Sequence, residues 1–386
     1  MASMTTNKSL GVLMVTALVL TAYLWLFLHA ESQLMVGLLV TLGVLGVFLS
    51  RKFQINQQIS LAVAEKSGWA RALFILGAVA LIAAFHDSHF VLLMLCAVLL
   101  FSTACLGLTV QFGYSGVANF AGAAFFGIGG YATAVMATHT QIPHVLVVLL
   151  SGLIAAGIGS VLITPVLRTR GHYAALVTIA FGILFKTFIE VNDVLGGPQG
   201  LQVPGMKIFG FALNDGFNLT GIDLSFYVTY ALLSLGIFGT VYTLVSALER
   251  SWIGLSMDVV RTDETAASTF GLHISRWKVI AFTLGNFFAG IAGSMYGMIS
   301  GFVAPNNFTF SDSLLMLSIV ILGGLGNIVG LIPAALIVLV LPEKLQFIQE
   351  YRFLLFAALV IMILLFRPQG LLPRQTRIFY RSKVAS

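Results

Sequence analysis

Residues 90–110 read FVLLMLCAVLLFSTACLGLTV and contain no charged side chain. The hydrocarbon core of a bilayer is about 30 Å thick, and a helix needs roughly 20 residues to cross it. Inside lipid, a helix also satisfies its own backbone hydrogen bonds, which an open strand cannot do. The stretch therefore predicts a membrane-spanning helix.

Apolar stretches of similar length recur along the chain. We expect further spans at Leu10–His29, Leu34–Ser50, Ala70–Phe85, Val117–Thr138, His144–Leu167, Tyr173–Val191, Ser225–Leu248 and Val279–Ser300. Three segments near the end predict either three crossings or two crossings and a re-entrant hairpin: Leu314–Ile332, Pro333–Pro342 and Phe353–Phe366. The pattern predicts an all-α, polytopic integral membrane helical bundle of about 10–12 spans.

The composition supports this class of protein. The chain has 386 residues, of which 59% are hydrophobic and 9% are charged, whereas soluble domains carry roughly 25% charged residues. The net charge of +6 does not indicate a nucleic-acid partner, because the basic residues lie in short loops between apolar stretches. Cys96 and Cys105 lie in one apolar segment without metal-ligand or redox spacing, so we expect two buried thiols.

The basic residues also predict an orientation. With the N-terminus inside and twelve crossings, one side receives most of the Lys and Arg, as cytoplasmic loops do. These residues are Arg51, Lys52, Lys66, Arg71, Arg168, Arg170, Arg250, Arg261, Arg276, Lys278 and the five basic residues after Phe366. The other side receives Lys207, Lys344 and Arg352. Both termini are therefore expected in the cytoplasm.

Two loops are too long to be simple turns. The outer one, Asn192–Leu224, contains GGPQG at 196–200 and a further Pro-Gly at 204–205, which predict turns. The inner one, Glu249–Lys278, lacks proline and interleaves apolar residues with charges. This second pattern predicts short amphipathic helices at the membrane surface.

The inner loop contains RTDETAASTFG at 261–271. Thr262 is the expected N-cap, and Gly271 can take the left-handed conformation that ends a helix. Asp263 and Glu264 would lie in the first turn, where the helix dipole favours anions. Such a short exposed helix can be gripped by a cytosolic partner and pass on a rigid-body movement, or it can be an ordinary interfacial helix.

Glycines mark candidate translocation-path segments. Six lie close together in the sequence, at Gly113, Gly116, Gly122, Gly127, Gly129 and Gly130. Small residues allow close helix packing, which we favour for most of these positions, or a chain break that lines a cavity. Ser115 and Asn119, one helical turn apart, could offer polar groups to a zwitterionic solute. Gly323, Gly324 and Gly326 form a second glycine group near the C-terminus. Two broken segments in corresponding positions indicate a transport path between repeats.

Charged residues within a span are few. Lys186 and Glu190 are one helical turn apart and could form a functional ion pair or extend to the membrane interface. Glu190 and Asp193 could also form part of an outer mouth. The sequence shows neither a phosphate-binding GxxxxGK[ST] loop nor an HExxH or Cys/His cluster. We therefore expect no metal site and no cofactor, and any ATP would be hydrolysed by another polypeptide.

Several motifs resemble a known family when taken together. Glu264, Ala266, Ala267 and Gly271 are similar to the coupling loop of ABC importer permeases, although Thr265 splits the usual Glu-Ala-Ala run. Other stretches are similar to segments of branched-chain amino-acid permeases of the LivM-type branch, and they occur in the same order as in that family. They are GYSGVANFAGAAFFGIGGY at 113–131, LRTRGHYAALVT at 167–178, GGPQG at 196–200, ILGGLG at 321–326 and RPQGLLP at 367–373.

The resemblance implies a function and a set of partners. It implies a vitamin-B12-permease-like (type II ABC importer) architecture in a prokaryotic cytoplasmic (inner) membrane. The chain would be one of two permease subunits, working with two cytosolic ATPase subunits and an extracytoplasmic solute-binding protein. Arg261, Glu264, Ala266, Ala267 and Gly271 would form the ATPase-coupling loop. The domain expectation is variable N-terminal spans at 1–69, a permease core at 70–373 and a basic cytoplasmic tail at 374–386.

Departures from the family leave the cargo open. Ala118–Ala121 replaces a more usual Leu-Ser-Leu-Gly, Ala123 stands where His is common, and His172 stands where Asp is frequent. Branched-chain or other neutral amino acids are the expected cargo, and urea or short amides are the alternative. An ion-coupled secondary transporter would need more charged residues at mid-membrane. A membrane-embedded enzyme would need convergent His, Asp or Glu residues.

Overall fold

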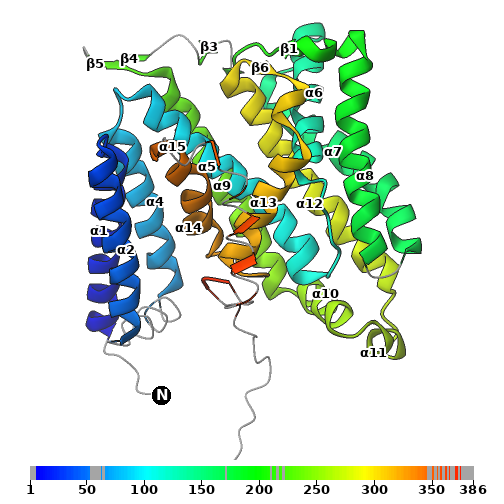
Figure 1. Cartoon of the computed structure of the whole chain (residues 1–386), viewed down its shortest axis with the longest axis horizontal. Helices are drawn as coiled ribbons and strands as arrows, with labels where there is room; N and C mark the ends of the chain where they lie inside the picture. The colour runs from blue at the N-terminus through cyan, green and yellow to red at the C-terminus, as the bar shows by residue number, and fades with distance from the viewer. Residues whose placement is uncertain are drawn as a thin grey trace, which may run out of the picture. The chain divides into compact units, whose positions relative to one another are not determined.

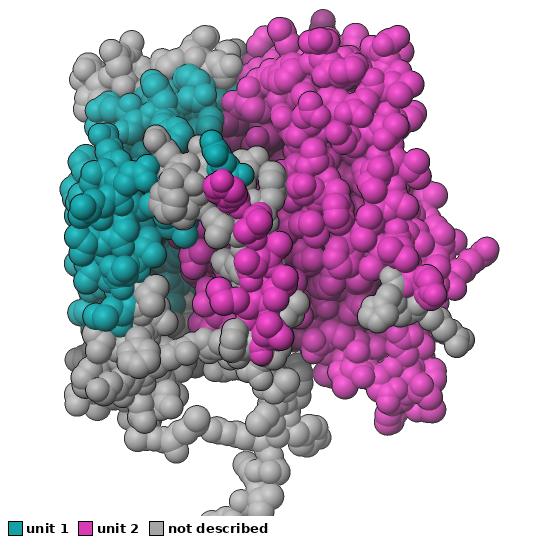
Figure 2. Space-filling model, viewed as in Figure 1, with its two compact units in different colours: residues 1–96, 216–235, 341–350 teal, residues 97–215, 236–340, 351–386 magenta. Residues whose placement is uncertain are grey.

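The computed structural model describes residues 6–52, 62, 66–169, 172–208, 211–213, 217–219, 222–345, 350–351, 354, 357–358, 361–362, 365, 370–372 and 374. Helices dominate the chain (Figure 1). It divides into two compact units, coloured in Figure 2: unit 1 is residues 1–96, 216–235 and 341–350, and unit 2 is residues 97–215, 236–340 and 351–386. The division falls inside helices α5 (His89–Leu108) and α9 (Phe226–Arg250).

Long apolar helices confirm the polytopic helical class. In the described part of the chain, 7 helices are long and apolar enough to cross a membrane. They are Ser9–His29, His89–Tyr114, His144–Arg168, Tyr173–Val191, Phe226–Arg250, Ile274–Ser300 and Pro305–Gly323, and two shorter apolar helices cover Gln33–Gly43 and Gly68–Ala84. Helix α6 (Gly122–His139) is not among these seven, and most of its residues are buried.

Unit 1 contains the helices α1 (Thr6–His29), α2 (Gln33–Lys52) and α4 (Ser67–Ala84). The Tyr23 hydroxyl of α1 donates to the carbonyl of Leu39 in α2 at 3.0 Å. Lys344, in α15 (Leu341–Lys344), donates to the carbonyls of Leu28 and Ala30 at 2.7 and 3.1 Å. A lysine there satisfies carbonyls that the end of α1 leaves unpaired.

Helix α12 (Ile274–Ser300) is the centre of unit 2, where it packs against α6 and α7 (His144–Arg168). A Cβ atom at Gly129 of α6 would collide with the carbonyl of Gly290, and one at Gly293 with the carbonyl of Phe126. Small residues let the two helix backbones touch, as in other membrane bundles. These glycines pack helices together, as we expected for most of the set.

The predicted span Val117–Thr138 was wrong at its start. Helix α5 continues as a π-helical turn, η1 (Thr109–Tyr114), and residues 115–121 then run without regular helix to the start of α6 at Gly122. Gly116 has φ +72°, a conformation that breaks the helix, and the Val117 amide donates back to Gln111. The sequence pattern does not reveal this break, because apolar residues continue on both sides of it.

The predicted span Leu314–Ile332 was also wrong as one helix. Helix α13 (Phe310–Gly323) begins with a capping box between Thr309 and Asp312 and ends at Gly323. Gly324 and Gly326, with φ of +109° and +83°, turn the chain. A second helical segment follows as α14 (Leu331–Ala335) and the π-turn η5 (Leu336–Val340), and Gly330 touches Gly323 at the crossing. Most of the expected segment Phe353–Phe366 lies outside the described residues.

Short strands modify the all-α expectation. In unit 2, β1 (Leu201–Gln202) pairs antiparallel with β6 (Phe302–Val303), and β2 (Lys207–Ile208) pairs with β3 (Phe211–Ala212). In unit 1, β4 (Phe217–Leu219) pairs with β5 (Ile222–Leu224). Most of these strands belong to the long loop in which glycine and proline predicted turns. Between α8 (His172–Val191) and β1 lie the turns η2 (Asp193–Leu195) and η3 (Gly197–Gln199), and η4 (Pro305–Asn307) follows β6.

Candidate functional site

The loop after α9 forms two short helices, α10 (Trp252–Thr262) and α11 (Glu264–Thr269), before α12 begins. Both lie at the end of unit 2 opposite the β1–β6 pair (Figure 1). The interleaved charges had predicted short helices here, and the structure confirms them. We call α10 and α11 together the loop helices.

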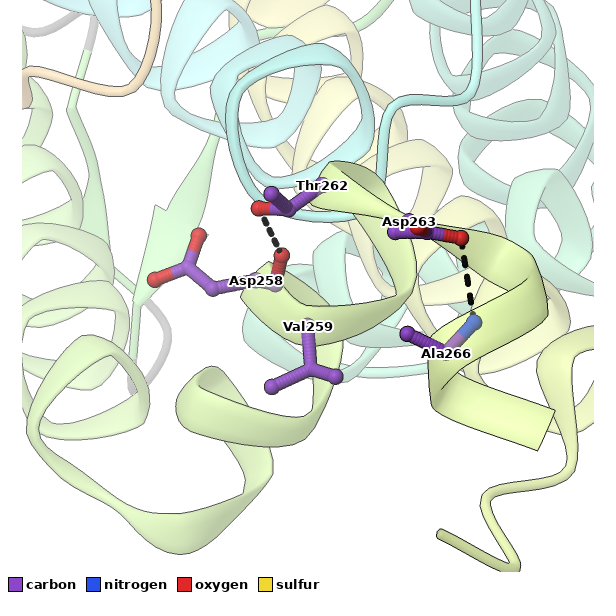
Figure 3. A pocket seen from close by; sticks show the side chains of 5 residues that line it. All are labelled: Asp258, Val259, Thr262, Asp263 and Ala266. Atoms are coloured by element: carbon purple, nitrogen blue, oxygen red, sulfur yellow. Dashed lines mark hydrogen bonds between the residues drawn. The ribbon is translucent and has the colours of Figure 1, made fainter. Parts of the chain in front are cut away.

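The N-cap of α11 is Asp263, so the expectation of Thr262 was wrong. The Asp263 carboxylate accepts hydrogen bonds from the amides of Thr265 and Ala266 at 2.8 and 3.0 Å. Thr262 is instead the last residue of α10, and its hydroxyl donates to the carbonyl of Asp258 at 2.8 Å (Figure 3). Both residue types cap helices well, and the extended backbone that a cap requires falls one residue later.

Gly271 ends α11 as predicted, with φ +77°. The amide of Leu272 donates to the carbonyl of Ala267 at 3.1 Å, and that of Gly271 to Ser268 at 3.0 Å. Ala267 is fully buried, whereas Phe270, beside the cap, is 80% exposed. A large exposed ring on a fixed turn is a ready anchor for a partner surface.

An open depression of about 280 Å³ lies between the loop helices (Figure 3). Its lining residues are Asp258, Val259, Thr262, Asp263 and Ala266. In Figure 3, the side chains of Asp258 and Val259 come from α10, and Ala266 comes from the first turns of α11. A shallow hollow on a short two-helix surface suits contact with a protein better than enclosure of a small ligand.

Two basic residues tie the loop helices to the bundle. The Lys278 ammonium of α12 lies 2.6 Å from the carboxylate of Glu264, the first residue of α11. The Arg261 side chain of α10 packs over Gly116, at a point where an added Cβ would lie 3.1 Å from Arg261 Cγ. Helix α11 is therefore in contact with α12, and α10 is in contact with the irregular segment before α6.

Arg374 contacts several polar and aromatic groups of unit 2, and no feature of the sequence predicts these contacts. Its guanidinium donates to both carboxylate oxygens of Asp258, at 2.6 and 2.8 Å. It also lies 3.6 Å from Glu249 and 4.4 Å from the centre of the Tyr114 ring. Burial alone would lower the pKa of Arg374, but the hydrogen bonds and charge of Asp258 outweigh it and raise that pKa. The guanidinium is charged at every physiological pH.

Three buried amides join η1, the segment before α6, and α12. Gln111 donates to Asn286 and to the carbonyl of Phe282, both at 2.9 Å. Asn119 donates to Gln111 at 2.8 Å and to Asn286 at 3.1 Å. We call Gln111, Asn119 and Asn286 the amide cluster. A glutamine and an asparagine within apolar spans are signals from which Gln111 and Asn286 could have been selected.

The candidate path residues are buried and internally bonded in this conformation. The Ser115 hydroxyl donates to the carbonyl of Gln111 at 2.8 Å, and Asn119 belongs to the amide cluster. Ser115 and Asn119 do not share a helical face, because residues 115–121 are not helical. Gly122 packs on Leu108, and Gly127 would meet Phe308 with any larger side chain.

The second glycine group lies beside the first at one point. The Gly326 backbone leaves no room for a Cβ at Gly113, and Gly324 lies against Gly370 in the same way. Gly323 packs on Gly330 within the α13–α14 crossing. The structure thus brings Gly326 to the π-turn η1 but leaves Gly127 in a helix-packing contact.

Lys186 and Glu190 lie on one face of α8 with their charged atoms 3.2 Å apart, and both are about one-third exposed. Asp193 begins η2 two residues after α8 ends. The loop after it is fixed by positive φ angles at Gly196 and Gly200, and Gly200 touches the backbone of Val303 in β6. Lys186, Glu190 and Asp193 thus lie at the end of unit 2 that is opposite the loop helices (Figure 1).

The fold and these contacts define a multi-pass helical membrane protein with an exposed two-helix loop. Residues 90–365 match the family described as "Branched-chain amino acid transport system / permease component". The chain belongs to this family of membrane permease components.

Named relatives agree with the family match. The chain is 34% identical over 287 residues to the "High-affinity branched-chain amino acid transport system permease protein LivM" of Salmonella typhimurium (strain LT2), covering 69% of this chain and 66% of that one. The Escherichia coli (strain K12) protein of the same name has the same identity and coverage. LivH of Salmonella typhimurium, from a system of the same description, is 25% identical over 297 residues, covering 71% of this chain and 91% of LivH. No solved structure matches the chain significantly.

Proposed function

We propose that the chain is the membrane-spanning permease subunit of an ATP-binding-cassette importer for branched-chain or other neutral amino acids. The family description and the names of the relatives support the transport function and this cargo class. The observation that carries the mechanism is α11, a capped, exposed helix tied to α12 through Glu264 and Lys278. A rigid handle of this kind suits the transfer of force from another subunit.

The proposal includes the partners. LivM and LivH, two differently named permease proteins of Salmonella typhimurium, both match this chain, which supports a second permease subunit beside it. Two cytosolic ATPase subunits would bind the loop helices, and an external solute-binding protein would bind the opposite end of unit 2. Residues 261–271 would then be cytoplasmic, as would both termini, in a prokaryotic inner membrane. A vitamin-B12-permease-like architecture with about 10–12 spans fits this arrangement.

The contacts of the loop helices give a route by which movement would pass through the subunit during transport. ATP-driven closure of the ATPases would move α10 and α11 as one body, because Asp263 joins them by its backbone and caps the second. Lys278 would carry the movement to α12, and Arg261 would carry it to Gly116 before α6. The amide cluster would then open a polar path for a small, net-neutral solute between permease subunits. The apolar bundle disfavours net charge in its path.

The test is uptake into liposomes that contain the full importer. Labelled leucine should accumulate only when the ATPases can reach ATP and the binding protein is on the other side. Competition by unlabelled leucine, urea and acetamide then identifies the cargo class. Accumulation by this chain alone, driven by an ion gradient, would refute the proposal.

A further inference from the structure

We propose that Arg374 is a positioning residue that couples α10 to the buried amide cluster through the π-turn η1, with Asp258 as its obligate partner. The proposal rests on the proposed function, because it assigns the route by which the loop helices move the transport path. It assigns a role to residues 370–372 and 374, which follow the region that matches the family.

The first step of the route is the contact between Arg374 and α10. Two parallel N–H···O bonds fix the guanidinium on the Asp258 carboxylate, and Glu249 of α9 adds a second negative charge at 3.6 Å. The Arg374 side chain is 15% exposed and that of Asp258 is 30% exposed, so water screens the pair weakly. Such forks fix orientation as well as distance, which a lysine cannot do.

The second step is the contact between Arg374 and η1. The guanidinium lies over the ring of Tyr114, which is fully buried, and one of its N–H groups points to the carbonyl of Gly113 at 3.4 Å. Gly326 and Gly113 meet backbone to backbone on the same side. A guanidinium is attracted to the face of an aromatic ring. Arg374 thus contacts both the backbone of η1 and its buried Tyr114 side chain, so a movement of α10 would displace η1.

The third step runs inside η1. Gln111 belongs to this turn, and its side chain holds both Asn119 and Asn286. Single π-turns within helices are frequent at functional sites, and they alter the register of the helix that contains them. A shift of Tyr114 would thus change the hydrogen bonds that close the amide cluster. The route is continuous from α10 to α12.

The segment that carries Arg374 is itself anchored. The Leu371 amide donates to the carbonyl of Leu322 at 2.8 Å, and the Asn327 side chain donates to the carbonyl of Leu372 at 2.9 Å. These contacts hold the backbone of 370–372 on α13 and its turn without help from Arg374. Removing the guanidinium should therefore break the coupling route while the segment stays in place.

The experiment compares full importers in liposomes, with uptake and ATP hydrolysis normalised to the amount of complex. Arg374→Gln and Asp258→Asn should each lower the leucine transported per ATP by roughly 5- to 150-fold, the range of allosteric coupling energies. The double variant should be no worse than either single variant, because both changes cut the same link. Arg374→Lys should fall in between, since it keeps the charge and loses the fork. Arg71→Gln, near the start of α4, is the matched control and should transport like the unmodified chain.

Two results would overturn the proposal. In the first, Arg374→Gln transports as many leucines per ATP as the unmodified importer, and any lower uptake reflects a smaller amount of complex, which would make Arg374 a structural residue only. In the second, the losses of the two single variants multiply in the double variant. Failure of the proposed function looks different, because the unmodified importer would then show no ATP-dependent uptake.

Discussion

Lys278 Nζ lies 2.6 Å from Glu264 Oε1, so the first residue of α11 is tied to the beginning of α12. The Glu264 side chain is 56% exposed, and exposed ion pairs contribute about 0–1 kcal/mol to stability. A pair this weak matters little for folding. Under the proposed function, its role is to transmit the movement of α11 to α12.

Glu264→Arg should therefore uncouple the importer without unfolding it. Two cations would face each other at the contact with Lys278, and α11 would lose its link to α12. We expect ATP hydrolysis to persist while leucine uptake falls by roughly tenfold or more. Uptake and hydrolysis measured on one preparation check this, with thermal unfolding in detergent as the folding control. The exchange Glu264→Lys with Lys278→Glu restores opposite charges and should recover part of the uptake; no recovery would argue against this contact.

Asp263→Ala should loosen α11 by removing its N-cap. The carboxylate accepts from two backbone amides, and loss of such a cap costs roughly 0.5–2 kcal/mol. Hydrogen exchange at Ala266 should accelerate, with a partial loss of uptake. Asp263→Asn is the matched control, because it keeps the acceptor and removes only the charge. Equal exchange rates in the alanine variant and the unmodified chain would contradict the assignment of the cap.

Gly129→Ala should destabilise unit 2, because its methyl group would enter the Gly290 carbonyl of α12. Overpacking typically costs 1–3 kcal/mol in well-packed interiors. The midpoint of thermal unfolding in detergent should fall. Gly157→Ala in α7 is the control, since an added Cβ there meets nothing within 4 Å. A fall of equal size in both variants would show that the close α6–α12 crossing is not the cause.

Gln111→Leu should disturb the amide cluster. Asn119 and Asn286 would lose their shared partner, and a buried unsatisfied polar group costs about 1–3 kcal/mol. We expect a lower unfolding midpoint and altered leucine uptake per complex. Gln111→Glu keeps the acceptor but loses both donated bonds, so it separates the role of the donor. Unchanged stability and uptake in the leucine variant would show that the amide cluster contributes neither to stability nor to transport.

The sequence predicted the class of protein because apolar length alone decides it. The helices that end at His29, Arg168 and Ser300 stop at the expected end of a span or one residue beyond it, because a bilayer requires helices of that length. The breaks at Gly116 and Gly324 could not be located, because their causes are positive φ angles inside an otherwise apolar run. Glycine also occurs where two helices pack closely, as at Gly129, so the residue type alone does not distinguish a break from a helix contact.

The sequence predicted only those parts of the candidate site whose residues lie close together in the chain. Gly271 and the short helix before it follow from residues within one turn of each other, so their pattern could be read from the chain. The pair Arg374–Asp258 joins residues 116 positions apart, and Gln111–Asn286 joins residues 175 positions apart. Neither pairing can be read from the sequence, because the contact depends on how helices distant in sequence pack; only the polar types of Gln111 and Asn286 stand out within their apolar spans.

We propose that energy reaches this permease through α11 from a cytosolic ATPase. A photoreactive side chain in place of the exposed Ser268, in the intact importer, tests it directly by the identity of the cross-linked protein. We expect a cross-link to the ATPase subunit, in a yield that changes with ATP. A cross-link to the external binding protein, or labelling of residue 268 from outside the cell by an impermeant reagent, would contradict it.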